Sequence, residues 1–369
     1  MSAPNFGLAD PTHVDLTTAS QHDVLCYLFY TPNDYKGYLG ARVSSIFVIL
    51  VVSSFVTFFP VAAARVPKLK IPIYVYLFAR YFGSGVIVAT GFVHLLDPAY
   101  YEIGTFTCVG SAPGWIQYSW PPAFAMFAGV VTFLLDFAAD RYVEKKYGIT
   151  FMGSHSVTTQ ANCDAGGVDL HTISRRPSME EKQVAPREEP DLEAVDRLGK
   201  DRLDDLGFKQ QITAFLVLEF GVIFHSVIIG LTLGSAGNEF VILYVVIIFH
   251  QSFEGMGIGA RLSGIPFPRK YHWMPWALCA AYGLTTPISI AIGLAVRTTF
   301  NPNGYTANIV QGVLDALSGG ILIYTGFVEL LARDFLFNPD RVKDDRKLAF
   351  MVVCVCAGAG LMAFLGKWI

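Results

Sequence analysis

Charged residues are scarce in this sequence. Asp, Glu, Lys and Arg make up 15% of its 369 residues, whereas an ordinary soluble domain contains about 25%. Hydrophobic residues make up 53%, and the mean hydropathy is +0.45. This balance excludes a soluble protein of ordinary composition and indicates an integral membrane protein surrounded by lipid. The net charge of −3 and the lack of a nucleic-acid-binding motif give no indication of a nucleic-acid partner.

Cysteine motifs and targeting signals are lacking as well. None of the six cysteines has the spacing of a zinc ribbon. Residues 1–40 are polar and contain no basic segment followed by an apolar core, so no cleavable signal peptide is predicted. We expect these residues to form an N-terminal tail.

Long apolar runs are the dominant feature of the rest of the chain. They lie at residues 43–64, 73–98, 120–139, 210–234, 239–260, 274–296, 307–332 and 348–366, each close to the ~20 residues that a membrane-spanning helix requires. The expected fold is therefore an all-α integral membrane protein with eight transmembrane helices. Helices 1–3 fall in residues 41–141, a hydrophilic loop in 142–208, and helices 4–8 in 209–369. Only Ser235 to Asn238 join the fourth and fifth spans, which predicts an antiparallel hairpin of neighbouring helices.

Lysine and arginine are concentrated in alternate loops. Residues 65–70, 261–270 and 333–347 are rich in them, whereas residues 99–117 and 235–238 have none. Because short basic loops stay on the cytoplasmic side, both termini are predicted to be extracytoplasmic. Cys26 and Cys108 then lie on the oxidising side, where a disulfide between them is our hypothesis.

The loop at residues 142–208 is rich in Ser, Asp, Glu, Arg and Gly, and we expect a cytoplasmic segment that is mostly disordered. Within this disordered segment we consider one ordered element, a short amphipathic helix at 192–206. Two interpretations of the remainder stay open: a solvated linker and a segment that loosely holds a metal ion. Separately, Ser178 follows a basic Arg-Arg-Pro sequence that is typical of a kinase site. The residues of the metal-holding reading are His155, Cys163, Asp164, Asp169 and His171.

Ionisable residues inside the apolar runs are costly and point to function. His225 lies nine residues before Gly234, and His250 eleven after Glu239, so both should lie about 13–17 Å from the same end of their helices. Glu254 is one helical turn after His250 and shares its face. His94 adds a third imidazole from the second span. Three imidazoles and one carboxylate are a plausible four-coordinate set for Zn²⁺, although each histidine taken alone is more often a hydrogen-bonded core residue.

Further acids lie within or at the ends of the spans. We interpret them as an exit path of carboxylates; the alternative is that Asp136 is merely interfacial and that Glu219 pairs with Arg80. The acids of this proposed path are Asp136, Glu219, Glu329 and Asp315.

Four segments together resemble the ZIP (Zrt/Irt-like) family of divalent-metal transporters. They are HSVIIG from His225, HQSFEG from His250, ARYFGSGVIVATGFVHLL ending at Leu96, and the acidic loop between spans three and four. The resemblance covers all eight spans and is greatest to the fungal and plant plasma-membrane branch. It implies zinc uptake into the cytoplasm, extracytoplasmic termini, a rocking or elevator-like movement of the helices that bear the site, and a homodimer.

Carried onto this sequence, the resemblance places the first metal position of the family at His94, His225, His250 and Glu254. At the second position of the family's binuclear members this chain departs from the pattern. Ile229, Gln251 and Thr286 stand where those members have carboxylates, and Ser226 and Gln251 are weak ligands. We therefore predict a single-ion site, with Ser226, Gln251 and Thr286 as a weak second site or as residues that surround the first.

The sequence thus predicts a transporter that moves Zn²⁺ into the cytoplasm by alternating access, with no cofactor and no enzymatic activity. Fe²⁺, Mn²⁺ and Cd²⁺ are alternative substrates. A less favoured class is an intramembrane zinc hydrolase, but HQSFE is not the HExxH arrangement of metalloproteases. A metal-sensing receptor is the third class, suggested by His13, Asp15, His22 and Asp23 in the N-terminal tail.

Overall fold

The computed structural model describes residues 15, 17–29, 37–66, 72–147, 192–237, 239–297, 304–337 and 344–368. Within these residues all regular structure is helical, and eight helices are long and apolar enough to cross a membrane. Each of the eight predicted spans overlaps one of them, so the predicted all-α, eight-span fold is confirmed. The metal-holding residues considered in the loop, from His155 to His171, and Ser178 lie outside the described residues.

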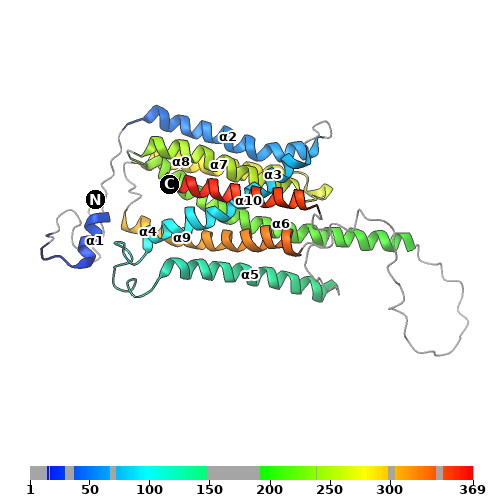
Figure 1. Cartoon of the computed structure of the whole chain (residues 1–369), viewed down its shortest axis with the longest axis horizontal. Helices are drawn as coiled ribbons and strands as arrows, with labels where there is room; N and C mark the ends of the chain where they lie inside the picture. Colours follow the sequence, from blue (N-terminus) through cyan, green and yellow to red (C-terminus); the bar gives the residue numbers. More distant parts are fainter. Residues whose placement is uncertain are drawn as a thin grey trace, which may run out of the picture.

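Figure 1 shows the spanning helices as one elongated bundle. The elements are α1 (Gln21–Phe29), α2 (Leu39–Arg65), α3 (Ile73–Ala89), the π-helix η1 (Thr90–Leu96), α4 (Asp97–Ile103), α5 (Trp120–Tyr147), α6 (Leu192–Ser235), α7 (Phe240–Ser263), the 3-10 turn η4 (Arg269–Tyr271), α8 (Met274–Val296), α9 (Tyr305–Tyr324), the π-helix η5 (Thr325–Phe337), α10 (Asp345–Leu365) and the 3-10 turn η6 (Gly366–Trp368).

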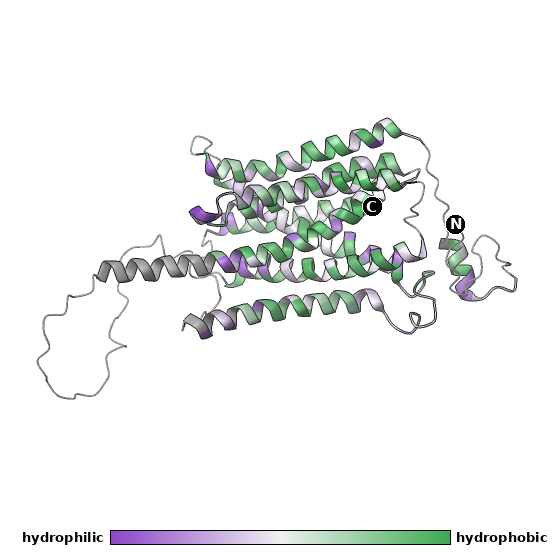
Figure 2. Cartoon of the chain, turned by 180° about the vertical axis from the view of Figure 1, so that it is seen from behind, coloured by the Kyte–Doolittle hydropathy of each residue, from purple (hydrophilic) through white to green (hydrophobic). Residues whose placement is uncertain are grey.

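Hydrophobic residues predominate along the helices of the bundle (Figure 2), and many of their side chains are exposed. On α5, for example, Phe127 and Phe133 are 61% and 51% exposed. Such exposure would favour aggregation in water but suits contact with lipid tails, where helices satisfy all their backbone hydrogen bonds internally.

The second and seventh spans each change from α- to π-helix. The second runs unbroken from Ile73 to Ile103 as α3, η1 and α4, although Pro98 lies within it. A proline removes one backbone N–H and clashes with the turn before it, and the wider π turns of η1 directly precede Pro98. Segments of π-helix occur frequently at functional sites, and here η1 contains His94.

Helical structure extends into both ends of the range 142–208 that we assigned to the hydrophilic loop. Helix α5 continues to Tyr147 and α6 begins at Leu192, so both extend into the range 142–208. The short helix considered at 192–206 is present as the first part of α6. It is continuous with the fourth span because Leu, Glu, Lys, Arg and Ala favour a helix and no proline interrupts it, although Gly199 and Gly207 lie within it.

The helices pack in two groups. In the first, α6 lies along α8 and α7 along α2, with α2 also against α8. In the second, α10 lies along α3, α5 along α9, and α9 along η1 and α4. The groups meet chiefly where α3 crosses α7 and α6 crosses α9. A Cβ at Gly83 of α3 would overlap the backbone of Gly257 in α7, so at that crossing the two groups touch backbone to backbone.

The fourth and fifth spans are not the closely packed neighbours that we predicted. Helices α6 and α7 are joined by the short turn at 236–239, yet each packs mainly on another helix. Small residues decide this: Gly230 and Gly234 of α6 abut Ser289 and Ile290 of α8. The hairpin is therefore splayed, and the histidine side chains reach across between its arms.

One end of the bundle carries α1 and the loop before α5, and we call it the disulfide end. Cys26 of α1 and Cys108 of that loop form a disulfide, which confirms the predicted pairing, and His22 lies 2.7 Å from the Ser111 hydroxyl. The described parts of both chain ends lie on this side of the bundle (Figure 1). The opposite end, where α5 ends and α6 enters the bundle, is called the linker end.

Candidate metal centre

His225 of α6 and His250 of α7 meet in the bundle interior. Both side chains are buried, and their Nε2 atoms are 3.3 Å apart. Two nitrogens bound at about 2.0–2.1 Å to one tetrahedral Zn²⁺ lie about 3.3–3.4 Å apart. The splayed hairpin thus holds two imidazoles at the spacing that a single tetrahedral ion requires.

Glu254 completes a group of three potential ligands. It is fully buried, and its Oε2 atom is 3.8 Å from His250 Nε2. One ligand atom from each of His225, His250 and Glu254 lies within 4.8 Å of the others. Glu254 Oε1 and His250 Nδ1 have no hydrogen-bond partner. A buried carboxylate with one unpartnered oxygen beside two imidazoles is a donor set suited to a divalent cation.

His94 lies next to this group but is oriented differently. Its ring meets that of His250 edge to face, with centroids 4.9 Å apart, while its Nε2 atom is 3.0 Å from the carbonyl oxygen of Met362 in α10. Because a carbonyl only accepts hydrogen bonds, Nε2 carries the proton and donates it. The lone pair is then on Nδ1, which is buried and has no partner. The structure brings three of the four predicted ligands together, and His94 is available only through Nδ1.

Among the residues predicted to form a weak second metal position, Gln251 and Thr286 are hydrogen-bonded to each other. The Gln251 amide Nε2 donates to Thr286 Oγ1 at 2.9 Å, and the Tyr282 hydroxyl lies 2.6 Å from Gln251 Oε1 and donates to it. Both ends of the Gln251 amide are therefore engaged, and Ile229 packs in an apolar cluster. Of the predicted set only the Ser226 hydroxyl, which is fully buried, has no partner.

Tyr282 of α8 is a site residue that the sequence analysis missed. Its buried hydroxyl is 3.3 Å from Glu254 Oε2 and contacts Gln251. It lies four residues before Thr286, so both face α7. A buried tyrosine hydroxyl almost always needs a polar partner. Because Tyr282 lies one helical turn before Thr286 in an apolar span, the sequence could have indicated that its hydroxyl faces the site.

Glu219 lies on the linker side of His225 along α6. It is 2% exposed, and neither carboxylate oxygen has a hydrogen-bond partner, although its charge interacts with that of Glu254. The alternative in which Glu219 pairs with Arg80 is wrong. Arg80 instead holds Asp334 through Nε at 3.1 Å and Nη2 at 2.8 Å, because η5 brings that acid against α3.

Of the other acids of the predicted path, two lie near Arg333 and one lies on the opposite side of the histidines. Glu329 is paired with Arg333, and Asp136 on α5 lies against Tyr324 and Arg333. Asp315 lies on the disulfide side of the histidines, next to Glu102. It therefore does not continue the linker-side series formed by Glu219 and Glu329.

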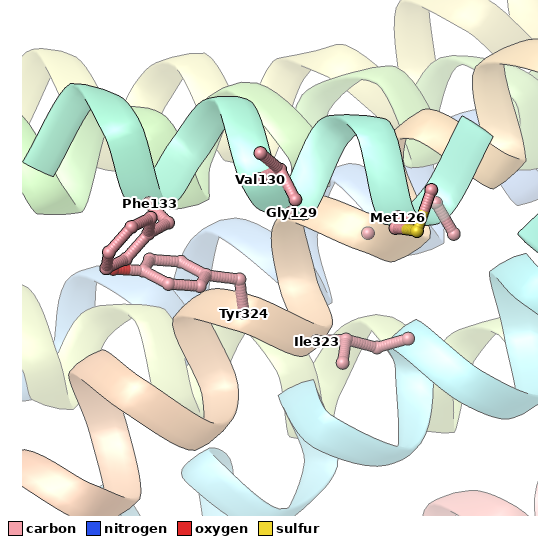
Figure 3. Close-up of a pocket in the computed structure, with 8 residues that line it drawn as sticks. Met126, Gly129, Val130, Phe133, Ile323 and Tyr324 are labelled. Atoms are coloured by element: carbon pink, nitrogen blue, oxygen red, sulfur yellow. The ribbon is translucent and has the colours of Figure 1, made fainter. Parts of the chain in front are cut away.

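A recess of about 470 Å³ lies between α5 and α9, and none of the buried histidines lines it (Figure 3). Its lining is almost entirely apolar, so it lacks the donors that a metal ion needs. The residues that line it are Ala125, Met126, Gly129, Val130, Phe133, Gly320, Ile323 and Tyr324. The buried histidine and glutamate group is the better candidate for a functional site.

Comparison with known proteins gives consistent results. The profile of a family described as "ZIP Zinc transporter" matches residues 39–366. The chain is 52% identical over 370 residues to Zinc-regulated transporter 1 of Saccharomyces cerevisiae, covering 97% of this chain and 96% of the relative. It is 41% identical over 359 residues to Zinc-regulated transporter 1 of Schizosaccharomyces pombe, covering 91% and 86%. Zinc-regulated transporter 2 of S. cerevisiae is 33% identical over 411 residues, covering 91% and 96%.

Proposed function

Because the chain belongs to the ZIP zinc transporter family, and is therefore a multi-pass membrane transporter rather than an enzyme, we propose that it carries Zn²⁺ across the membrane through the site at His225, His250 and Glu254. The observation that carries this proposal is the 3.3 Å separation of two buried imidazole nitrogens beside a buried carboxylate. The names of the relatives, zinc-regulated transporters, support zinc as the substrate.

The site binds one ion at a time. A second ion would need oxygen donors around Gln251, but its amide is held by Thr286 and Tyr282. With one carboxylate and neutral imidazoles, a bound Zn²⁺ keeps a net charge of about +1. Such a site holds the ion less firmly than one with two carboxylates, and exchangeable binding is what transport requires.

Alternating access follows from the distribution of ligands over the two helix groups. His225, His250 and Glu254 belong to α6 and α7 in the first group, whereas His94 is on η1 in the second. Movement of one group against the other would separate His94 from the remaining ligands and weaken binding. The ion would then leave toward Glu219, whose two unpartnered oxygens lie on the linker side.

We propose uptake into the cytoplasm, with the linker end inside and both termini outside the cytoplasm at the plasma membrane. The basic loops at 261–270 and 333–347 support this orientation, and the Cys26–Cys108 disulfide supports an oxidising environment at the other end. The division into a tail (1–40), helices 1–3 (41–141), a loop (142–208) and helices 4–8 (209–369), and the homodimer, are part of the same proposal.

Flux into liposomes tests this function. Purified protein reconstituted into vesicles should take up ⁶⁵Zn²⁺, and Glu254→Gln, which keeps the shape of the side chain but removes its charge, should abolish uptake. Unlabelled Cd²⁺, Fe²⁺ and Mn²⁺ as competitors would rank the alternative substrates. If Glu254→Gln vesicles filled as fast as the wild type, the central site would not be the transport site.

A further inference from the structure

Two acids outside the central site face each other at the packing of α4 on α9. Asp315 is 4% exposed, and its Oδ1 atom has no hydrogen-bond partner. Glu102 Oε2 is buried and also unpartnered. The charge of Asp315 acts on Glu102, and Gly312, three residues before Asp315, lies against the Glu102 side chain. Among the described residues neither acid forms an ion pair with a lysine or arginine.

Close helix packing brings the two carboxylates together. A Cβ on Gly312 would lie 2.7 Å from Ile103 Cγ2 and 3.1 Å from the Glu102 Cβ atom, so α9 approaches α4 closely only because residue 312 has no side chain. Asp315 is three residues further along α9 and therefore shares the face of Gly312. The packing of α4 on α9 thus directs Asp315 toward Glu102.

The level of this pair relative to the histidines follows from the same helices. A Cβ on Gly319 would touch the Gly91 carbonyl and Leu95, so α9 descends from the level of Ile103 to that of η1 between residues 312 and 319. Asp315 lies between these two levels. Glu102 is eight residues from His94, or about 12 Å along a helix, toward the disulfide end.

Two facing carboxylates without a counter-charge repel each other, and a protein interior tolerates them only when bound protons or a bound cation remove that charge. A proton shared between them would appear as a hydrogen bond from one carboxyl to the other. Among the described residues no hydrogen bond joins these two side chains, and each acid keeps a buried oxygen without a partner. Each acid therefore has one oxygen that remains available to bind a cation.

We propose that Glu102 and Asp315 form a second divalent-cation site, through which the ion passes between the disulfide end and the histidines. The pair supplies oxygen donors and a charge of −2, so it binds a partly hydrated divalent ion without selecting strongly for Zn²⁺. The central site, with its imidazoles, then selects among the ions delivered to it. This proposal rests on the transport function proposed above and adds an entry step to it.

Metal binding to the purified full-length protein tests the pair directly. Mn²⁺ is the probe, because it prefers carboxylate oxygens to histidine and cysteine, and its binding is followed by the loss of the free Mn²⁺ electron paramagnetic resonance signal. Glu102→Gln, Asp315→Asn and the double variant should each weaken Mn²⁺ binding by at least about tenfold. Asp97→Asn is the matched control, because Asp97 is an exposed acid on the same helix α4.

The outcomes separate this proposal from the transport function. If the double variant binds Mn²⁺ as tightly as the wild type, the pair is a shared-proton contact and the proposal is overturned, whatever the flux. If Mn²⁺ binding is lost and the KM for ⁶⁵Zn²⁺ flux rises about tenfold while flux at saturating Zn²⁺ persists, the entry site is supported. A protein that binds Mn²⁺ at the pair but moves no metal would retain this site and refute the transport function. The exchange variant Glu102→Asp/Asp315→Glu, which preserves both charges, should restore binding if the neutral variants fold poorly.

Discussion

The two π-helical segments have nearly the same sequence but different surroundings. Residues 90–96 read TGFVHLL and residues 325–331 read TGFVELL; they differ only at His94 and Glu329. His94 lies beside His250 and donates to a backbone carbonyl, whereas Glu329 is paired with Arg333, and its carbonyl accepts from Arg261 at 3.2 Å.

This difference separates two uses of buried charge. Around Glu329 the acids are paired with arginines. We call the five residues of this cluster the arginine network; they are Arg80, Arg261, Glu329, Arg333 and Asp334. Around His94 several polar atoms have no hydrogen-bond partner, namely His94 Nδ1, His250 Nδ1 and Glu254 Oε1. A buried charge that is already paired holds helices together, while unpartnered donors are available to a passing cation. The same local fold therefore has its charges paired in one place and its polar atoms without partners in the other.

The largest effect is expected from removing a ligand beside the first segment. His250→Ala should reduce ⁶⁵Zn²⁺ flux by at least about 100-fold, because His250 contacts His94, His225 and Glu254. Folding should persist, because a neutral imidazole is removed and Glu254 keeps its hydrogen bond from Tyr282. His272→Ala, at an exposed histidine of the linker end, is the control, and equal flux in both variants would remove His250 from the site.

The next effect concerns the arginine network. Arg80→Gln leaves Asp334 without its counter-charge and should lower stability by about 1–3 kcal/mol, less than a fully buried pair, because the Arg80 side chain is 31% exposed. Thermal unfolding in detergent measures this loss. The charge-reversed pair Arg80→Asp/Asp334→Arg should recover part of it, and a stability equal to the wild type in Arg80→Gln would show that the network is not structural.

A smaller effect distinguishes the two nitrogens of His94. Glutamine places its amide near the position of Nε2 and can keep the bond to Met362, whereas asparagine places its oxygen near that of Nδ1. If His94 binds metal through Nδ1, His94→Gln should lower flux about tenfold and His94→Asn should lower it less. The reverse order would mean that the contact with Met362, rather than the free nitrogen, matters.

The smallest effect is expected at Tyr282. Tyr282→Phe removes the hydroxyl that contacts Glu254 and Gln251 and should raise the KM for Zn²⁺ about threefold, the value of one modest hydrogen bond. Flux measured over a range of Zn²⁺ concentrations, with Tyr271→Phe at the linker end as control, gives this number. An unchanged KM would show that Glu254 is oriented without Tyr282.

The spans and most of the central site could be predicted from the sequence because their signals are local. Apolar runs of sufficient length require membrane helices, and His225, His250 and Glu254 are conspicuous because ionisable residues are rare in such runs. The single-ion site, inferred from the departures at Gln251 and Thr286 from the family pattern, stays a prediction. Helix neighbours could not be predicted, since α6 packs on α8 through Gly230 and Gly234 rather than on α7.

The sequence by itself determined that this chain is an eight-helix membrane protein with a His and Glu site, because run length and residue chemistry are read along the chain. Only the tertiary structure decided which atoms remain free. The bond from His94 to Met362 joins residues 268 positions apart, and Glu102 meets Asp315 across two helices. Whether a potential ligand atom is engaged in a hydrogen bond or available to a metal ion depends on its neighbours in space. Helix packing determines those neighbours.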